Sequence, residues 1–173
     1  MKALAFWKRV TVDDTNLLDQ LLVLLADSGV DYCVIGGQAV NAYVEPVVSL
    51  DLHLVVSLRE VERIEPLLRQ RFKVERFPHS LNVSLAGSDL RVQIQLDPRY
   101  DAFVPHASAK NVLGVQLSVA RLDDVLQGKI WAAQDPTRRR SKRQKDLADI
   151  ARLVESYPDL RRQVPVDILN RLI

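Results

Sequence analysis

The chain has 173 residues, of which 47% are hydrophobic and 27% charged, a composition typical of a globular protein with one domain, or one domain and a helical appendage. The single cysteine, Cys33, excludes an internal disulfide, and the N-terminal residues lack the apolar run and cleavage site of a signal peptide. No apolar run approaches membrane-spanning length, so we expect a cytoplasmic protein without a membrane partner.

Hydrophobic periodicity and turn residues predict five elements in the first half of the chain. Acidic residues favour a helix start near Asp13, and Gly29 favours its end. Ser57 and Glu60 have the spacing of a capping box at the start of a later helix, which Pro66 would bend or split. In order, the predicted elements are a helix at 13–28, a strand at 32–35, a short helix at 38–44, a strand at 51–56 and a helix at 57–72.

The second half begins with alternating apolar and polar residues, which is typical of strands that bury one face. The alternation is clearest at 90–96, where Val92 and Ile94 point to one face and Gln93 and Gln95 to the other. The predicted elements are strands at 74–77, 82–85, 90–96 and 115–119, a loop or short helix at 98–113, and helices at 122–134, 141–156 and 166–173. Their order predicts an α/β (α+β) fold with a C-terminal helical part.

A small cleft is predicted where the strand at 32–35 ends. Gly36 and Gly37 form a tight corner before the short helix, and Asp51 and His53 share one face of the next strand because side chains at i and i+2 point the same way. Each feature also has a purely structural interpretation. Glycines suit any strand-to-helix turn, and an Asp-x-His pair suits any solvent-facing strand.

The segment Arg138–Lys145 holds six cations in eight residues, although the net charge of the chain is only +2. These cations lie at a predicted helix start, where the helix dipole disfavours positive charge. An anionic partner, either a triphosphate or an RNA backbone, would offset that cost. Asp146 and Asp149 have a structural explanation as i,i+4 partners of Lys142 and Lys145.

The hydrophobic strand, the Gly-Gly corner, the short helix and the following acidic strand together resemble the nucleotidyltransferase superfamily. The distal pattern of Lys129, a basic loop and then Lys145-Asp146-Leu147-Ala148-Asp149 is similar to its abortive-infection, AbiE-toxin-like branch. The resemblance covers residues 31–153. It implies a nucleotidyltransferase-type core at 1–121, with a mixed sheet flanked by helices, and a helical subdomain at 122–173.

The resemblance also implies two divalent ions, Mg²⁺ or Mn²⁺, which bridge phosphate oxygens and activate the attacking hydroxyl. Family members hold the ions with an Asp-x-Asp strand and a third carboxylate from a neighbouring strand. Here Asp51 matches the first position, His53 replaces the second, and Gln93, or Gln95 in the other register, stands at the third. The ligand charge falls from three negatives to one, so we expect weakened two-metal chemistry.

Individual roles follow from the resemblance. Asp51 and His53 would be the metal ligands, with proton transfer as the alternative role of His53. Lys129 lies on an apolar helix face, so it either extends to solvent or, as the resemblance implies, contacts phosphate in the cleft. Asp146 would orient the basic cluster. The implied catalytic residues are Asp51, His53, Lys129 and Asp146, and the implied nucleotide-binding residues are Gly36, Gly37, Ser49, Gln93, Lys129, Arg140 and Lys145.

Two functions are compatible with these patterns. The first is transfer of a nucleotidyl group from a nucleoside triphosphate to RNA, a protein or a small hydroxyl compound, with RNA bound through Arg138–Lys145. The second is a catalytically inactive protein of the same fold, which keeps the cleft to bind a ligand or partner protein in a defence or toxin–antitoxin system. The missing carboxylates favour the second function, and the family resemblance favours the first.

Overall fold

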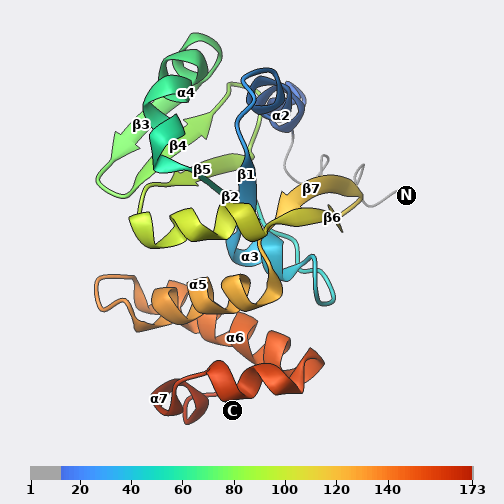
Figure 1. The fold of residues 1–173 in the computed structure, drawn as a ribbon, viewed down its shortest axis with the longest axis vertical. Coiled ribbons are helices and arrows are strands. Elements are labelled where there is room, and N and C mark those ends of the chain that lie inside the picture. The colour runs from blue at the N-terminus through green and yellow to red at the C-terminus, as the bar shows by residue number, and fades with distance from the viewer. Residues whose placement is uncertain (1–12, 173) are drawn as a thin grey trace.

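The computed structural model describes residues 13–172 and shows a seven-stranded mixed sheet flanked by helices (Figure 1). The strands are β1 (Tyr32–Ile35), β2 (Asp51–Val56), β3 (Lys73–Phe77), β4 (Ser80–Ser84), β5 (Arg91–Gln95), β6 (Ser108–Val112) and β7 (Val115–Val119). Their order in the sheet is β3-β4-β5-β2-β1-β7-β6. The β1–β7 and β2–β5 pairs are parallel, and the other pairs are antiparallel. The predicted α/β fold is confirmed.

Helices lie at both ends of the molecule, and one short helix lies in the middle beside the sheet (Figure 1). They are α2 (Leu17–Asp27), α3 (Gly36–Val40), α4 (Leu58–Arg71), α5 (Leu122–Gln134), α6 (Arg140–Ser156) and α7 (Val166–Leu169), with 3₁₀ segments η1 (Pro98–His106) and η2 (Pro158–Gln163). Helices α2 and α4 contact each other at one end. Helices α5 and α6 pack together at the other end, and α3 contacts both of them as well as β1 and β2. A domain boundary at residue 121 stays a prediction.

Several local predictions differ from the structure. The short helix begins at Gly36, earlier than predicted, and ends at Val40. The segment predicted as a loop or short helix at 98–113 forms η1 and then the edge strand β6. Helix α4 continues through Pro66 without a split. The last predicted helix ends at Leu169, and Ile173 lies outside the described residues.

The predicted capping box at Ser57 is wrong, because the Ser57 side chain makes no capping hydrogen bond. The carboxylate of Asp101, in η1, accepts instead from the backbone N–H of Leu58 at 2.8 Å. An acceptor at the first turn of a helix satisfies one of its unpaired N–H groups whether it is local or distant in sequence. Asp101 therefore joins η1 to the start of α4.

The alternation of β2 separates the hydrophobic core from the opposite face of the sheet. Leu52 and Leu54 are fully buried, whereas Asp51 and His53, which alternate with them, are only partly buried. Because neighbouring side chains of a strand point to opposite faces, this alternation turns the two polar residues of β2 toward α5 and α6.

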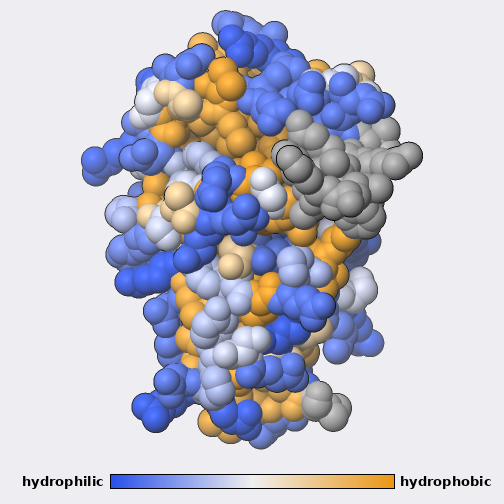
Figure 2. Space-filling model, turned by 90° about the vertical axis from the view of Figure 1, so that its right-hand side faces the viewer, coloured by the Kyte–Doolittle hydropathy of each residue, from blue (hydrophilic) through white to orange (hydrophobic). Residues whose placement is uncertain are grey.

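The face of the molecule seen in Figure 2 is mostly hydrophilic, with hydrophobic residues visible between the polar ones. Exposed large hydrophobic side chains among residues 13–172 include Val23, Val47, Val48, Phe77 and Val166. Within this described part of the chain, none of the helices combines the length and apolar character required to cross a lipid bilayer.

Candidate functional site

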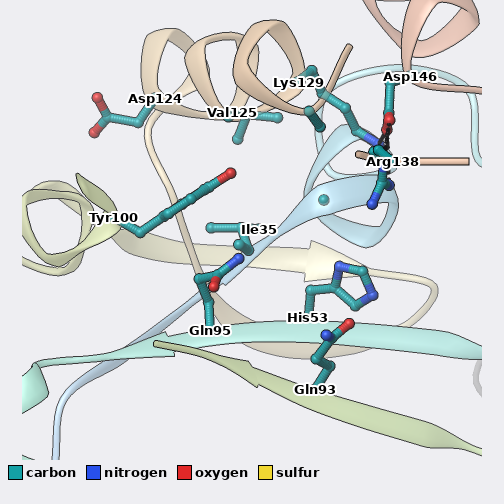
Figure 3. A pocket seen from close by; sticks show the side chains of 13 residues that line it. Ile35, His53, Gln93, Gln95, Tyr100, Asp124, Val125, Lys129, Arg138 and Asp146 are labelled. Carbon is teal, nitrogen blue, oxygen red and sulfur yellow. Dashed lines mark hydrogen bonds and ion pairs between the residues drawn. The ribbon is translucent and has the colours of Figure 1, made fainter. Parts of the chain in front are cut away.

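The parallel pair β2–β5 brings the predicted polar residues together. Asp51 lies opposite Arg91 and His53 lies opposite Gln93 in the register of the two strands. Paired residues of a ladder point to the same face of the sheet. Figure 3 shows the His53 and Gln93 side chains next to each other below Lys129, Arg138 and Asp146, with Gln95 further along β5.

Two neighbouring hollows lie over this strand pair, and we call them together the groove. The inner hollow has a volume of about 120 Å³ and the outer one of about 400 Å³. Both are lined by His53, Gln93 and Arg138. Residues of the inner hollow include Gly36, Tyr100, Asp124, Lys129 and Asp146, and those of the outer hollow include Asp51, Glu75, Asn82, Arg91 and Lys142.

Gly36 gives the inner hollow its close contact between the β1–α3 corner and β2. Its φ of +71° is a left-handed value that residues with a side chain rarely adopt, and an added Cβ would lie 3.1 Å from Nδ1 of His53. Gly37 lines neither hollow, and an added Cβ there would meet nothing within 4 Å. Ser49 also lines neither hollow; its hydroxyl accepts from the backbone N–H of Asp51 at 3.2 Å.

Asp51, the carboxylate predicted as a metal ligand, is held by two cations. Its Oδ1 lies 2.7 Å from Nε of Arg91, and its Oδ2 lies 3.7 Å from Nζ of Lys142. The side chain keeps 23% of its surface exposed. Both carboxylate oxygens therefore face positive charge from the protein itself.

The pKa of His53 is lowered to about 4, chiefly because burial disfavours the charged imidazolium. Three cations around the groove act in the same direction: Lys129, Arg138 and Lys142. Asp51, the largest of the charge effects, acts in the opposite direction, but burial outweighs it. His53 is therefore a neutral imidazole at pH 7.

Lys129 lies at the centre of a buried ionic network between α5 and α6. It is only 5% exposed, and its Nζ lies 3.0 Å from Asp146 and 2.7 Å from Asp149. Asp146 also accepts from Nε of Arg138 at 2.6 Å, and Asp149 pairs with Arg152 at 2.9 Å. Lys129 thus faces the inner hollow but is held by carboxylates, and it does not extend to solvent.

The predicted i,i+4 pairs of α6 are wrong. Asp146 does not pair with Lys142, and Asp149 does not pair with Lys145, within the described part of the chain. Both carboxylates are buried on the side of α6 that packs against α5, where Lys129 meets them. Lys142 instead reaches across to Asp51.

The basic segment Arg138–Lys145 contributes only in part to the groove. Arg138 lines both hollows and Lys142 lines the outer one. Arg140 lines a separate hollow with Arg143 and Arg171, and Lys145 is exposed and lines neither hollow of the groove. The structure thus brings His53, Gln93, Gly36 and Lys129 to the inner hollow, but leaves Arg140 and Lys145 outside the groove.

The donors in the groove do not fit a pair of magnesium or manganese ions. Such ions prefer several carboxylate or other hard oxygen ligands. Asp51 is already paired with Arg91, His53 offers nitrogen, and Gln93 offers one neutral amide oxygen. Over residues 13–172, no group of three or more histidine, cysteine or acidic side chains is arranged to hold a metal ion.

Arg91 and Tyr100 line the groove although they were not among the predicted site residues. Arg91 shares a strand face with Gln93, so its spacing was a usable signal for its place beside Asp51. Tyr100 packs against Gly128 of α5, where an added Cβ would lie 3.2 Å from its ring, and burial raises its pKa to about 12. No sequence pattern links Tyr100 to Gly128. The packing of η1 against α5 brings these two residues together.

The fold is similar to solved structures of nucleotidyltransferases. ANT(2'')-Ia in complex with adenylyl-2''-tobramycin aligns with a TM-score of 0.64 and 12% identity, covering 91% of this chain and 97% of that chain. The lincomycin-bound lincosamide antibiotic adenylyltransferase LnuA aligns with a TM-score of 0.55 and 12% identity, covering 83% of this chain and 99% of that chain. An antigenic nucleotidyltransferase-like protein from Paracoccidioides brasiliensis aligns with a TM-score of 0.51 and 17% identity, covering 90% of each chain. No protein-family model and no curated protein matches the sequence.

Proposed function

We propose that this chain binds a nucleoside triphosphate in the groove. Its function is then that of a nucleotide-binding protein with the nucleotidyltransferase fold. The observation that carries the proposal is the convergence of Arg138 and Lys142 on the β2–β5 face that bears His53 and Gln93. Guanidinium and ammonium groups are suited to phosphate oxygens. The likeness of the whole fold to ANT(2'')-Ia and LnuA supports the same use of this face.

The two hollows suggest how the ligand would lie. The outer hollow is lined by three cations, Arg91, Arg138 and Lys142, and by two acids, whereas the lining of the inner hollow holds as many acids as cations, so the outer hollow suits the phosphates better. Amides of Asn82 and Gln93 line the same hollow and can both donate and accept hydrogen bonds. They suit sugar hydroxyls or the edge of a base.

Nucleotidyl transfer is the second candidate, and one observation favours it. His53 is neutral at pH 7 because its pKa is lowered to about 4, so its imidazole can accept a proton from an acceptor hydroxyl. The hydroxyl oxygen would then bond to the α-phosphorus as the bond to pyrophosphate breaks. A base of such low pKa is weak, so we rank nucleotidyl transfer below nucleotide binding as the proposed function.

A role in a defence or toxin–antitoxin system rests on the resemblance to AbiE-like proteins. An acceptor that is RNA, a protein or a small hydroxyl compound rests on the wider resemblance to nucleotidyltransferases. A cytoplasmic location stays the expectation drawn from the sequence pattern. Arg139 and Arg140 are exposed beside Arg138, and they would be the first contacts of an RNA backbone. Such binding should weaken steeply as salt concentration rises.

Thermal stability measured with ATP, CTP, GTP and UTP tests the main proposal. A ligand that binds only the folded state raises the melting temperature in proportion to the logarithm of its concentration. We expect at least one nucleotide to do so, and Lys142→Gln to reduce the shift. Lys145→Gln, which removes an equal charge from the same helix outside the groove, is the matched control.

If none of the four nucleotides changes the melting temperature, nucleotide binding is excluded. Nucleotidyl transfer is tested separately, by measuring pyrophosphate release from a nucleoside triphosphate with the native protein and with His53→Gln. Release that is absent from the native protein, or that is unchanged in His53→Gln, would remove the assigned role of His53 in transfer.

A further inference from the structure

We propose that the groove binds nucleotide phosphates without a divalent metal, because side-chain cations of the protein supply the positive charge. The inference rests on the nucleotide binding proposed above and goes beyond it, since it concerns what neutralises the phosphates. It is carried by the ion pairs of the groove, by the chemistry of its uncharged side chains and by the anchoring of Arg138.

Every carboxylate that lines the groove already lies against a protein cation. Asp51 pairs with Arg91 at 2.7 Å and has Lys142 at 3.7 Å. The other pairs are Glu75 with Lys73 at 2.9 Å, Asp124 with Arg121 at 3.3 Å, and Asp146 with Arg138 at 2.6 Å and Lys129 at 3.0 Å. A metal ion would have to compete with these cations for the carboxylate oxygens.

The remaining polar groups do not compensate for the paired carboxylates. His53 and Gln93 lie side by side at the junction of the two hollows, and Asn82 lines the outer one. Imidazole is a poor ligand for magnesium, and two neutral amides add no charge to attract it.

Arg138 is anchored for contact with an anion. Asp146 accepts from its Nε at 2.6 Å and from its Nη2 at 3.4 Å. Figure 3 shows the guanidinium between Asp146 on one side and His53 on the other. A guanidinium fixed in this way loses little side-chain entropy when it binds phosphate. Lys142 is more exposed and approaches the same hollow from α6.

Isothermal titration of the full chain tests the proposal at fixed ionic strength. The probe is the nucleotide that stabilises the protein most, titrated in EDTA and then in Mg²⁺ or Mn²⁺. We expect the affinity in EDTA to equal or exceed that with metal, because the metal screens the phosphate charge that Arg138 and Lys142 recognise. Binding that requires metal, or that is clearly weaker in EDTA, would overturn the inference and leave nucleotide binding intact. Absence of binding in both conditions would overturn both proposals.

Two variants and a control variant distinguish a cation site from a metal site. Lys142→Gln should weaken binding in EDTA about tenfold, the effect of losing one charged contact of about 1.4 kcal/mol, whereas Lys145→Gln should leave it unchanged. Asp51→Asn should strengthen binding in EDTA, because it removes the carboxylate that pairs with Arg91 and Lys142 and leaves both cations free for phosphate. Loss of nucleotide binding in Asp51→Asn, with an unchanged melting temperature of the free protein, would identify Asp51 as a required ligand and contradict the proposal.

Discussion

Replacement of Lys129 by methionine tests whether the buried ionic network stabilises the fold. Methionine is close to lysine in length but carries no charge. The change leaves Asp146 and Asp149, which are 1% and 4% exposed, without the ammonium that lies between them at 3.0 and 2.7 Å. Two buried carboxylates then face each other without the cation that they share.

Removing one partner of a buried ion pair costs about 3–5 kcal/mol. Arg138 still pairs with Asp146 and Arg152 with Asp149, so we expect the lower end, about 3 kcal/mol. For a chain of this length, each kcal/mol lowers the melting temperature by about 2–4 °C. Lys129→Met should therefore melt about 6–12 °C below the native protein.

Urea unfolding followed by tryptophan fluorescence and circular dichroism gives the free energy of unfolding directly. The matched control is Lys73→Met, which breaks the exposed pair with Glu75 (side chains 72% and 52% exposed) and should cost less than about 1 kcal/mol. Replacing Asp149 by leucine together with Lys129→Met should recover part of the loss, because apolar packing often substitutes well for a buried pair. A loss below about 1 kcal/mol in Lys129→Met would refute this account of the network.

Two further predictions concern the inner hollow. Gly36→Ala should destabilise the protein by about 1–3 kcal/mol, because the φ of residue 36 is +71° and the new Cβ would press on His53. Gly37→Ala has open space for its Cβ and should change stability by less than about 1 kcal/mol. Thermal melting of the two variants compares these effects. Because the folded pKa of His53 lies near 4, below its unfolded value of 6.5, its contribution to stability is lost as pH falls through that window. Between pH 7 and pH 5 the native protein should lose about 2 kcal/mol more unfolding free energy than His53→Gln, and equal losses in urea titrations would contradict the lowered pKa.

The place of the polar residues on β2 and β5 could be predicted because strand alternation fixes the face of every side chain. The alternation predicted that Asp51 and His53 share a face of β2, and Gln93 and Gln95 a face of β5. It could not predict which neighbour pairs with Asp51. That depends on the register of β2 against β5, which places Arg91 opposite Asp51 and is set by contacts between segments far apart in the chain.

Edge and cap features escaped prediction for related reasons. Among residues 13–172, strand β6 (Ser108–Val112) pairs with β7 alone, and this polar edge strand lacks the apolar alternation of a strand that buries one face. The start of α4 is capped by Asp101, which is 43 residues away from Leu58. A local capping box at Ser57 was a reasonable prediction, but the approach of η1 supplied a stronger acceptor.

The ionic network also connects the groove to the far side of α6. From Arg138 it runs through Asp146, Lys129 and Asp149 to Arg152, which donates to the backbone carbonyl of Glu45 in the loop after α3. The position of the Arg138 guanidinium thus depends on the packing of α5 against α6. The Nζ of Lys129 is held by two carboxylates, one of which, Asp146, also holds Arg138, so Lys129 acts on a phosphate in the groove through Arg138. The lysine that the sequence suggested as a direct phosphate contact is better understood as a residue that positions the contact.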